Sequence, residues 1–263
     1  MVNTDKAWEH FGREDPYYGV LTNDAFTKDK IDDAARDVFF QSGEDYVDFI
    51  LSVVRDHLDP TYEPTRALDF GCGVGRVTLA LARRTSEAVG VDVSAGMIDE
   101  AVVNASESKL SNVRFAISDD RLSQVGGTFD LINSCIVFQH IATKRGVRFL
   151  RRLLDCLRDD GIGVIQMTYA NASSTPVTRR ILTSAYERIP FAFALRNVVK
   201  RERPKSPQMH MNRYDLSTVL RVLQEHGCHD IHVRFTEASH YNYPIYGVIL
   251  FFKKHPLDVS RYS

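Results

Sequence analysis

The sequence predicts an α/β fold built on a doubly wound, mostly parallel sheet with helices on both faces. From Ala67 onward, short apolar runs alternate with segments of helical periodicity, which is the pattern of such a sheet. The chain has 263 residues, of which 44% are hydrophobic. A chain of this size buries roughly 70–75% of its unfolded surface in one core. A single domain over residues 1–263 is therefore expected.

The central part of the chain supplies five strands with helices between them. In chain order, strands are expected at 66–71, 88–93, 112–118, 129–138 and 162–169. The first helix is expected over 76–84, directly after the first strand. Ser94 is expected to cap a second helix that buries Met97, Ile98, Ala101, Val102 and Ala105. Thr143 is expected to cap a third helix, which "DDG" at 159–161 ends.

The two ends of the chain are expected to complete this frame. Residues 1–62 include the helical "GEDYVDFILSVVRDHL" and are expected to form an N-terminal cap over one edge of the sheet. Residues 170–213 carry four prolines and interrupt the alternation, so they are expected to be an insertion after strand five. In the remainder, 214–263, Asp215 caps a helix before two closing strands at 230–235 and 246–254.

The charge balance and the cysteine content limit the kinds of partner and site that the sequence indicates. The 33 basic and 34 acidic residues nearly cancel, which gives no general attraction to nucleic acid or anionic membranes. The four cysteines form no C-x-x-C pair, so neither a disulfide framework nor a thiolate metal site is indicated. No apolar stretch approaches the ~20 residues of a membrane span, and no signal peptide is evident. We expect a soluble, cytoplasmic protein, either a monomer or a homodimer.

A glycine loop follows the first strand in "LDFGCGVGRVTLALARR". Gly71, Gly73 and Gly75 form G-x-G-x-G, whereas a dinucleotide site has G-x-G-x-x-G, and Arg76 stands where that third glycine would fall. No G-K-[ST] follows, which excludes a P-loop. Asp69, two positions before the first glycine, would repel a pyrophosphate but accept a hydrogen bond from a cationic amine.

Asp92 ends the second strand, where a carboxylate can accept hydrogen bonds from both hydroxyls of a ribose. The loop and the two acids together offer close backbone, a ribose acceptor and an anion, without a phosphate clamp. This combination fits S-adenosylmethionine, a nucleoside that bears a sulfonium and an amino acid end.

Residues 67 to about 170 resemble the class I, seven-strand, Rossmann-like methyltransferases that depend on S-adenosylmethionine. The matching pieces are "ALDFGCGVG", "VGVDVSAGMIDEA", "ISDD", "FDLINSCIVFQHI" and "LRDDGIGVIQM". The tail "MNRYDLSTVLRVLQEHGC" is also similar. The resemblance implies an antiparallel last strand, a cofactor-binding half at 63–169 and a lid or substrate role for the insertion. S-adenosylhomocysteine would be the product.

The resemblance also implies roles for single residues. Gly71, Gly73 and Gly75 would line the methionine portion, while Asp69 would shape the loop or bind the amino group. Asp92 would hold the ribose. The adenine would meet a larger set: Val93 and Met97 at its flanks, the backbone of Ser118, and either Asp119 or Asp120 at its exocyclic amine. Met97 has the alternative of a plain core residue. The segment from Ser134 to Phe138 would pass beneath the sulfonium.

Methyl transfer chiefly requires alignment, plus removal of a proton from a hydroxyl nucleophile. His140, just beyond strand four at the ligand-binding edge, is the first candidate base, with a packing role as the alternative. Tyr18 is a second catalytic candidate. Further aromatic and histidine side chains lie in segments that can fold over the cofactor, as candidate substrate contacts: Tyr17, His210, His240 and Tyr241.

The acceptor is expected to be a small molecule, sugar or natural product, methylated at oxygen or nitrogen without a metal. The [DN]-P-P-[FYW] motif of enzymes that methylate nucleic-acid amines is replaced by "NSCIVF", and "TYANAS" stands where metal-dependent catechol-type enzymes need acidic ligands. Residues 179–205 hold eight basic and two acidic residues, which suits an anionic or lipid-linked acceptor or, alternatively, a solvated helix face. The rival functions are a non-catalytic protein that binds S-adenosylmethionine or S-adenosylhomocysteine, and a nucleotide-dependent oxidoreductase.

Overall fold

The computed structural model describes residues 4–171, 209, 211–240 and 243–256. Its seven-stranded sheet has the order β3-β2-β1-β4-β5-β7-β6. The strands are β1 (Arg66–Phe70), β2 (Glu87–Asp92), β3 (Val113–Ile117), β4 (Phe129–Ser134), β5 (Leu157–Asn171), β6 (Cys228–His240) and β7 (Tyr243–Lys254). β7 runs antiparallel to β5 and β6, and the other pairs are parallel. The predicted fold class is confirmed.

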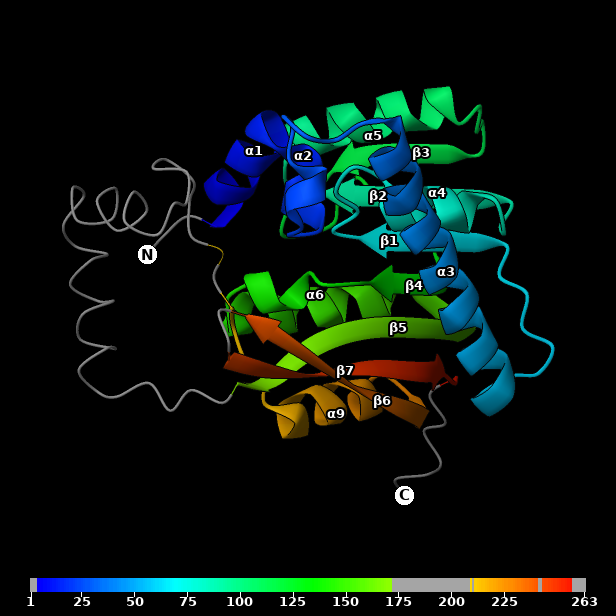
Figure 1. The fold of residues 1–263 in the computed structure, drawn as a ribbon. Coiled ribbons are helices and arrows are strands. Elements are labelled where there is room, and N and C mark those ends of the chain that lie inside the picture. Colours follow the sequence, from blue (N-terminus) through cyan, green and yellow to red (C-terminus); the bar gives the residue numbers. More distant parts are fainter. Residues whose placement is uncertain (1–3, 172–208, 210, 241–242, 257–263) are drawn as a thin grey trace, which may run out of the picture.

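Helices precede, connect and cover these strands (Figure 1). The N-terminal segment forms α1 (Thr4–Glu14), α2 (Pro16–Val20), the 3₁₀ turn η1 (Asp24–Phe26) and α3 (Asp33–His57). The connecting helices are α4 (Arg76–Ala82), α5 (Ala95–Glu107), the 3₁₀ turn η2 (Phe138–His140), α6 (Thr143–Cys156) and α9 (Leu216–Glu225). The chain order reverses beside β1, which pairs with both β2 and β4, so the switch point of the sheet lies at β1.

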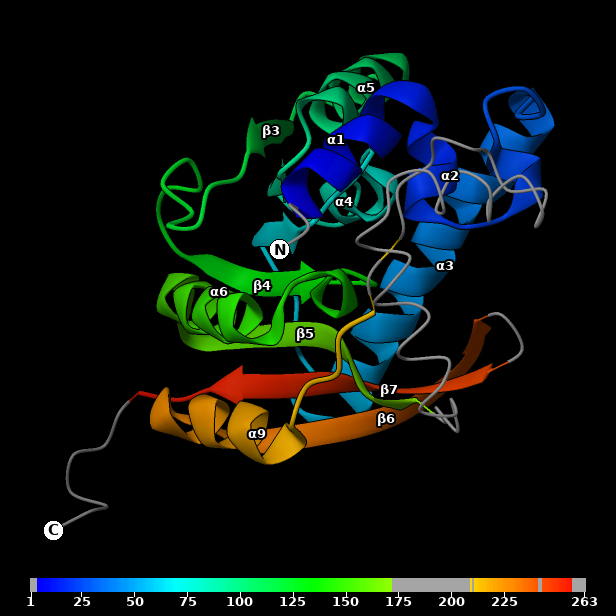
Figure 2. The same cartoon turned by 90° about the vertical axis from the view of Figure 1, so that its left-hand side faces the viewer.

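Each face of the sheet buries its own apolar cluster because strand side chains alternate between faces. Leu68, Val89 and Ile132 point to the side that α6 and α9 cover. Their neighbours Ala67 and Leu131 point to the opposite side, where α3 and α4 pack. Figure 2 shows α6 and α9 in front of the strands and α3 behind them.

The N-terminal segment does not cap an edge of the sheet, as the sequence suggested. α3 instead lies along a face, because its apolar residues Val47, Ile50 and Val54 join the cluster of β1, β4, β5 and β7. α1 and α2 pack against α5, close to the carboxyl ends of the central strands (Figure 1). They therefore form part of a roof over those strand ends.

Several local expectations need correction. Val102 is 52% exposed, because its side of α5 faces away from the sheet. Thr143 is the first residue of α6 rather than its cap, and its hydroxyl donates to the carbonyl oxygen of Arg213. "DDG" lies inside β5, where Asp160 adopts φ 61°. β4 ends at Ser134, four residues early, since Ile136 adopts φ 63° and leaves the extended conformation.

None of the helices among the described residues is long and apolar enough to cross a membrane. Most of the predicted insertion, residues 172–208, lies outside the described residues.

Candidate functional site

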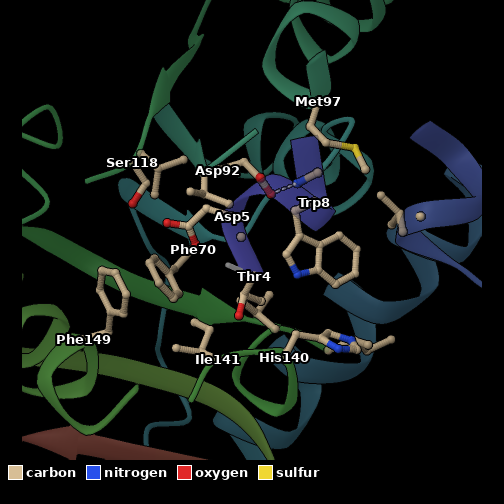
Figure 3. A pocket seen from close by; sticks show the side chains of 18 of the residues that line it. Thr4, Asp5, Trp8, Phe70, Asp92, Met97, Ser118, His140, Ile141 and Phe149 are labelled. Atoms are coloured by element: carbon tan, nitrogen blue, oxygen red, sulfur yellow. Dashed lines mark hydrogen bonds between the residues drawn. The ribbon is translucent and has the colours of Figure 1, made fainter. Parts of the chain in front are cut away.

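A cavity of about 840 Å³, part of it open to solvent, lies at the carboxyl ends of β1, β2 and β4. Six residues that the sequence assigned to the cofactor line it: Gly71, Gly73, Asp92, Val93, Met97 and Ser118. Figure 3 shows it between the strand ends and α1, which carries Trp8. The cavity therefore lies at the switch point, where doubly wound sheets bind ligands.

The glycine loop has a backbone that other residues rarely adopt. Gly71, Gly73 and Gly75 have φ angles of 78°, 52° and 89°. A Cβ on Gly73 would lie 2.4 Å from a methyl carbon of Val20, and one on Gly71 would lie 2.3 Å from a methyl carbon of Val137. Gly71 and Gly73 are thus required for both conformation and space, whereas Gly75 caps α4 and does not line the cavity.

Asp92 ties the glycine loop to the start of α5. Its Oδ2 accepts from the amide of Gly73 at 3.0 Å and its Oδ1 accepts from the amide of Ser94 at 2.9 Å. Burial raises the pKa of Asp92, and these backbone hydrogen bonds oppose the rise. A carboxylate has about four acceptor positions, so Asp92 keeps capacity for two hydroxyl donors from the cavity.

Asp69 lies under the loop and outside the cavity lining. It is 3% exposed, and its two oxygens accept from the Thr78 hydroxyl at 2.7 Å and the Asn133 amide at 2.8 Å. Burial raises the pKa of Asp69, while these two hydrogen bonds lower it. The carboxylate joins α4 to β4 beneath the glycines, which is the loop-shaping role among the two expected for it.

Besides Gly75 and Asp69, three further expected cofactor contacts lie outside the cavity lining. Asp119 closes its own turn, accepting from the amides of Arg121 and Ser123, both at 3.0 Å. Asp120 turns outward to Arg145, with its Oδ1 2.8 Å from Nε. Ser134 donates its hydroxyl to the carbonyl oxygen of Phe70 at 3.0 Å. Cys135, Ile136 and Val137 line the cavity at the end of β4 instead.

α1 forms a roof that the sequence analysis did not identify in detail. Thr4, Asp5 and Trp8 line the cavity, and Asp5 accepts a bidentate pair from Arg145, at 2.6 and 3.0 Å. Glu9 accepts from the Ser94 hydroxyl at 2.9 Å and from the Gly96 amide at 3.3 Å. Trp8 is the only tryptophan of the chain, but the sequence alone did not place α1, because these partners of Asp5 and Glu9 lie more than 80 residues away along the chain.

His140 lies in the cavity wall, in η2, and is 7% exposed. Its ring stands edge-on to Trp8 with centroids 4.8 Å apart, as Figure 3 shows. Its Nε2 lies 3.2 Å from Nε2 of Gln139, whose Oε1 accepts from the Thr168 hydroxyl at 3.1 Å. The imidazole is therefore held at the cavity from two sides.

The predicted aromatic and histidine contacts divide into two groups. Tyr17 is buried outside the cavity, where its single hydroxyl proton is shared between Glu100 Oε1, at 2.7 Å from the hydroxyl oxygen, and Asn104 Oδ1, at 2.8 Å. Burial and Glu100 raise the pKa of Tyr17 to about 12, so this residue anchors α2 to α5. Tyr18 packs half-buried in the cluster between α1 and α3, also outside the lining. The remaining three lie outside the described side chains: His210, His240 and Tyr241.

The charges of the cavity suit a cationic nucleoside better than a diphosphate. Its charged lining residues are Asp5, Asp92 and Arg145. Arg145 is already paired with Asp5 and Asp120, at 2.6 and 2.5 Å. Among the described residues, no three His, Cys, Asp or Glu side chains gather as metal ligands.

Comparison with known proteins gives the chain its relatives. Residues 67–161 match the family described as "Methyltransferase domain". The trans-aconitate 2-methyltransferase of Deinococcus radiodurans is 32% identical over 129 residues, which cover 48% of this chain and 46% of that protein. The ubiquinone biosynthesis O-methyltransferase of Ruegeria pomeroyi is 29% identical over 109 residues, covering 41% and 43%. A 23S rRNA (uracil-C5)-methyltransferase of Stenotrophomonas maltophilia is 45% identical over 64 residues, covering 24% and 14%. The chain spans less than half the length of these relatives.

Solved structures share the whole fold. The magnesium protoporphyrin IX methyltransferase of Synechocystis, with bound S-adenosylmethionine, superimposes with a TM-score of 0.59 at 16% identity, over 97% of this chain and 98% of that one. The N-methyltransferase NodS of Bradyrhizobium japonicum, with S-adenosylhomocysteine, gives 0.55 at 15% identity, over 96% and 98%. At such identities the likeness concerns the fold.

Proposed function

This chain belongs to the class I S-adenosylmethionine-dependent methyltransferases, and from that premise we propose that it methylates an oxygen or nitrogen of a small-molecule acceptor without a metal. One observation carries the proposal. Asp92 accepts from the amide of Gly73 in the glycine loop and faces the same cavity as His140. A site for the nucleoside and a candidate base therefore share one cavity.

The residues of the cavity fit the cofactor. The backbone at Gly71 and Gly73 is open for the methionine portion, the spare acceptor positions of Asp92 suit the ribose hydroxyls, and Val93 and Met97 offer apolar contacts to the adenine. S-adenosylmethionine supplies, when bound, a methyl group already activated on sulfur. The protein's task is then to align the acceptor, which can lower a barrier by ~7–11 kcal/mol.

His140 is our candidate for the general base. Its imidazole faces the cavity, while Trp8 and Gln139 restrict its orientation. A held imidazole can take the proton of a hydroxyl or amine as the nucleophile attacks, an effect commonly worth about 10²–10⁴-fold in rate.

A small acceptor is favoured because α1 roofs the cavity through Thr4, Asp5 and Trp8. Two relatives that match over 48% and 41% of this chain are named for trans-aconitate and for ubiquinone biosynthesis. The relative named for 23S rRNA matches over only 14% of its own length. An anionic or lipid-linked acceptor rests on the basic run 179–205, which lies outside the described residues.

Calorimetry with S-adenosylhomocysteine tests the cofactor. We expect Asp92→Ala to weaken binding at least about 10-fold, because each hydrogen bond to a charged acceptor is worth about 1.5–3 kcal/mol. Asp119→Ala is the matched control, since Asp119 closes a turn outside the cavity, and it should leave affinity unchanged. Binding of NADH without S-adenosylhomocysteine would establish the oxidoreductase alternative instead.

Label transfer tests catalysis. The wild-type protein, metabolite extracts and methyl-labelled S-adenosylmethionine should give a labelled product, which mass analysis identifies. On that acceptor, His140→Gln should lower kcat about 10²–10⁴-fold while S-adenosylhomocysteine affinity holds. Tight cofactor binding with no labelled product from any extract would favour the non-catalytic binder.

A further inference from the structure

Arg76 is a buried cation directly after the glycine loop. It is 6% exposed and begins α4, at the position where a dinucleotide-binding loop carries its third glycine. Its Nη1 donates to the carbonyl oxygen and hydroxyl of Ser42, at 3.2 and 3.3 Å. Its Nε has no hydrogen-bond partner among the described residues.

The partners of this guanidinium are neutral. No carboxylate of the described residues lies within 4.0 Å of it. Asp69 is near enough for the charge of Arg76 to lower its pKa, but its oxygens are used by Thr78 and Asn133. A buried charge without a touching counter-charge costs several kcal/mol, so the arrangement favours an anion from a ligand.

The guanidinium stands directly behind the cavity wall. Its Nη2 lies 3.9 Å from Sγ of Cys135, and Cys135 lines the cavity. β1 and β4 pair up to Asp69 and Asn133, and Gly71 and Cys135 each follow that pair by two residues, just beyond the ends of their strands. Arg76 itself is not among the lining residues, so the small side chain of Cys135, which contacts its Nη2, is the link between the guanidinium and the cavity beside Gly71.

We propose that Arg76 binds the carboxylate at the amino acid end of S-adenosylmethionine. This inference rests on the proposed function and adds an anion site to it. A guanidinium holds a carboxylate through two parallel N–H donors, and Nε with Nη2 supplies such a pair. The sulfonium and ribose then extend from Gly71 toward Asp92 along the cavity.

Two ligands that differ only in the carboxylate measure its contribution to binding. Calorimetry compares S-adenosylhomocysteine with its decarboxylated analogue, which keeps the thioether and the amine. We expect wild-type protein to prefer S-adenosylhomocysteine at least about 30-fold, since truncating a buried charge pair costs about 2 kcal/mol or more. In Arg76→Met the preference should fall below about 3-fold, and Arg76→Lys should keep part of it. Arg83→Met is the matched control, because Arg83 is a half-exposed partner of Glu44 at the other end of α4.

The outcomes separate the two proposals. If wild-type protein binds both ligands equally, or if Arg76→Met weakens both by one factor, Arg76 binds no cofactor carboxylate and the inference fails while the proposed cofactor stands. If Arg76→Met does not fold, Arg76→Lys decides, because the inference requires that it keep only part of the wild-type preference and an unchanged preference would overturn it. An Arg76→Met protein that raises KM for an anionic acceptor without changing the ligand preference would assign the cation to the acceptor. If neither ligand binds wild-type protein, the proposed function fails together with the inference.

Discussion

At the scale of single residues, the glycine loop is constrained by both conformation and space. Gly73→Ala would place a Cβ 2.4 Å from Val20 at φ 52°, whereas Gly126→Ala would meet nothing within 4 Å at a similar φ of 62°. We expect Gly126→Ala to lower the free energy of unfolding by about 1–2 kcal/mol through backbone strain alone. Gly73→Ala should cost about 1–3 kcal/mol more, because the overpacked contact adds to the strain.

Urea denaturation of both variants measures the two costs, with the wild-type chain as reference. The difference between the variants isolates the contact of the loop with Val20 of α2. Equal losses in the two variants would show that α2 does not press on the loop in solution.

Tyr17 gives a second residue-scale test because its hydroxyl serves structure alone. Tyr17→Phe removes the hydroxyl shared by Glu100 and Asn104 and leaves the buried Asn104 oxygen and the part-buried Glu100 carboxylate with one partner fewer. The expected loss is about 1–3 kcal/mol of unfolding free energy, with S-adenosylhomocysteine affinity unchanged. A marked loss of affinity at full stability would return Tyr17 to the list of ligand contacts.

The predicted site residues that line the cavity include those whose direction the local chain sets. Gly71, Gly73 and Asp92 lie within 22 residues of one another, and the end of a strand fixes where they point. The sequence could not distinguish the roles of Asp119 and Asp120. In the structure the Ser123 hydroxyl donates to Asp119, which closes the turn, while Asp120 turns outward to Arg145. Such a choice depends on turn geometry that the residue types alone do not specify.

At the scale of elements, α1 is held over the cavity by charged contacts with α5 and α6. Arg145 of α6 joins Asp5 of α1 to Asp120, and Glu9 of α1 accepts from Ser94 and Gly96 at the start of α5. These contacts are long-range in sequence. The sequence predicted an N-terminal cap but not where it packs, because amphipathicity shows which face of a helix is apolar and not which element that face contacts.

Removing the Arg145 contact should loosen the roof. We expect Arg145→Met to speed amide hydrogen exchange across residues 4–14 and to increase the dissociation rate of S-adenosylhomocysteine about 3- to 10-fold, while the sheet keeps its protection. Arg148→Met is the control, since the one ion pair of Arg148 with a described residue is the 3.8 Å approach to Asp120, at the exposed side. Unchanged exchange in α1 would mean that apolar packing alone seats the helix.

At the scale of the whole molecule, α3 connects the site to the far edge of the sheet. Ser42 near its start contacts Arg76, and His57 at its end stacks on His232 of β6 with ring centroids 3.9 Å apart. The strand alternation predicted all seven strands and their order along the chain. It could not predict that α3 crosses a face, because that depends on contacts with strands at both ends of the sequence.

The stacked histidines make stability depend on pH. Burial lowers the pKa of His232, and the neighbouring His57 and Arg234 lower it further. From β7, Phe251 faces the same ring, at 6.0 Å between centroids. An unfolded histidine titrates near about 6.5, so below this pH the unfolded chain binds a proton that the folded chain resists. The stability from neutral His232 is therefore complete above about pH 6.5 and is lost as pH falls toward its lowered folded pKa.

Thermal unfolding between pH 8 and pH 5.5 measures this loss. We expect the Tm of wild-type protein to fall over that range, and His232→Phe to reduce the slope, because an aromatic ring can keep the stack on His57 without binding a proton. His229→Gln, at an exposed position of the same strand, should keep the wild-type slope. The slope of the unfolding free energy against pH reports the difference in bound protons between the unfolded and folded states. Parallel curves of Tm against pH for wild-type and His232→Phe would therefore show that the folded chain accepts the proton at His232 without penalty.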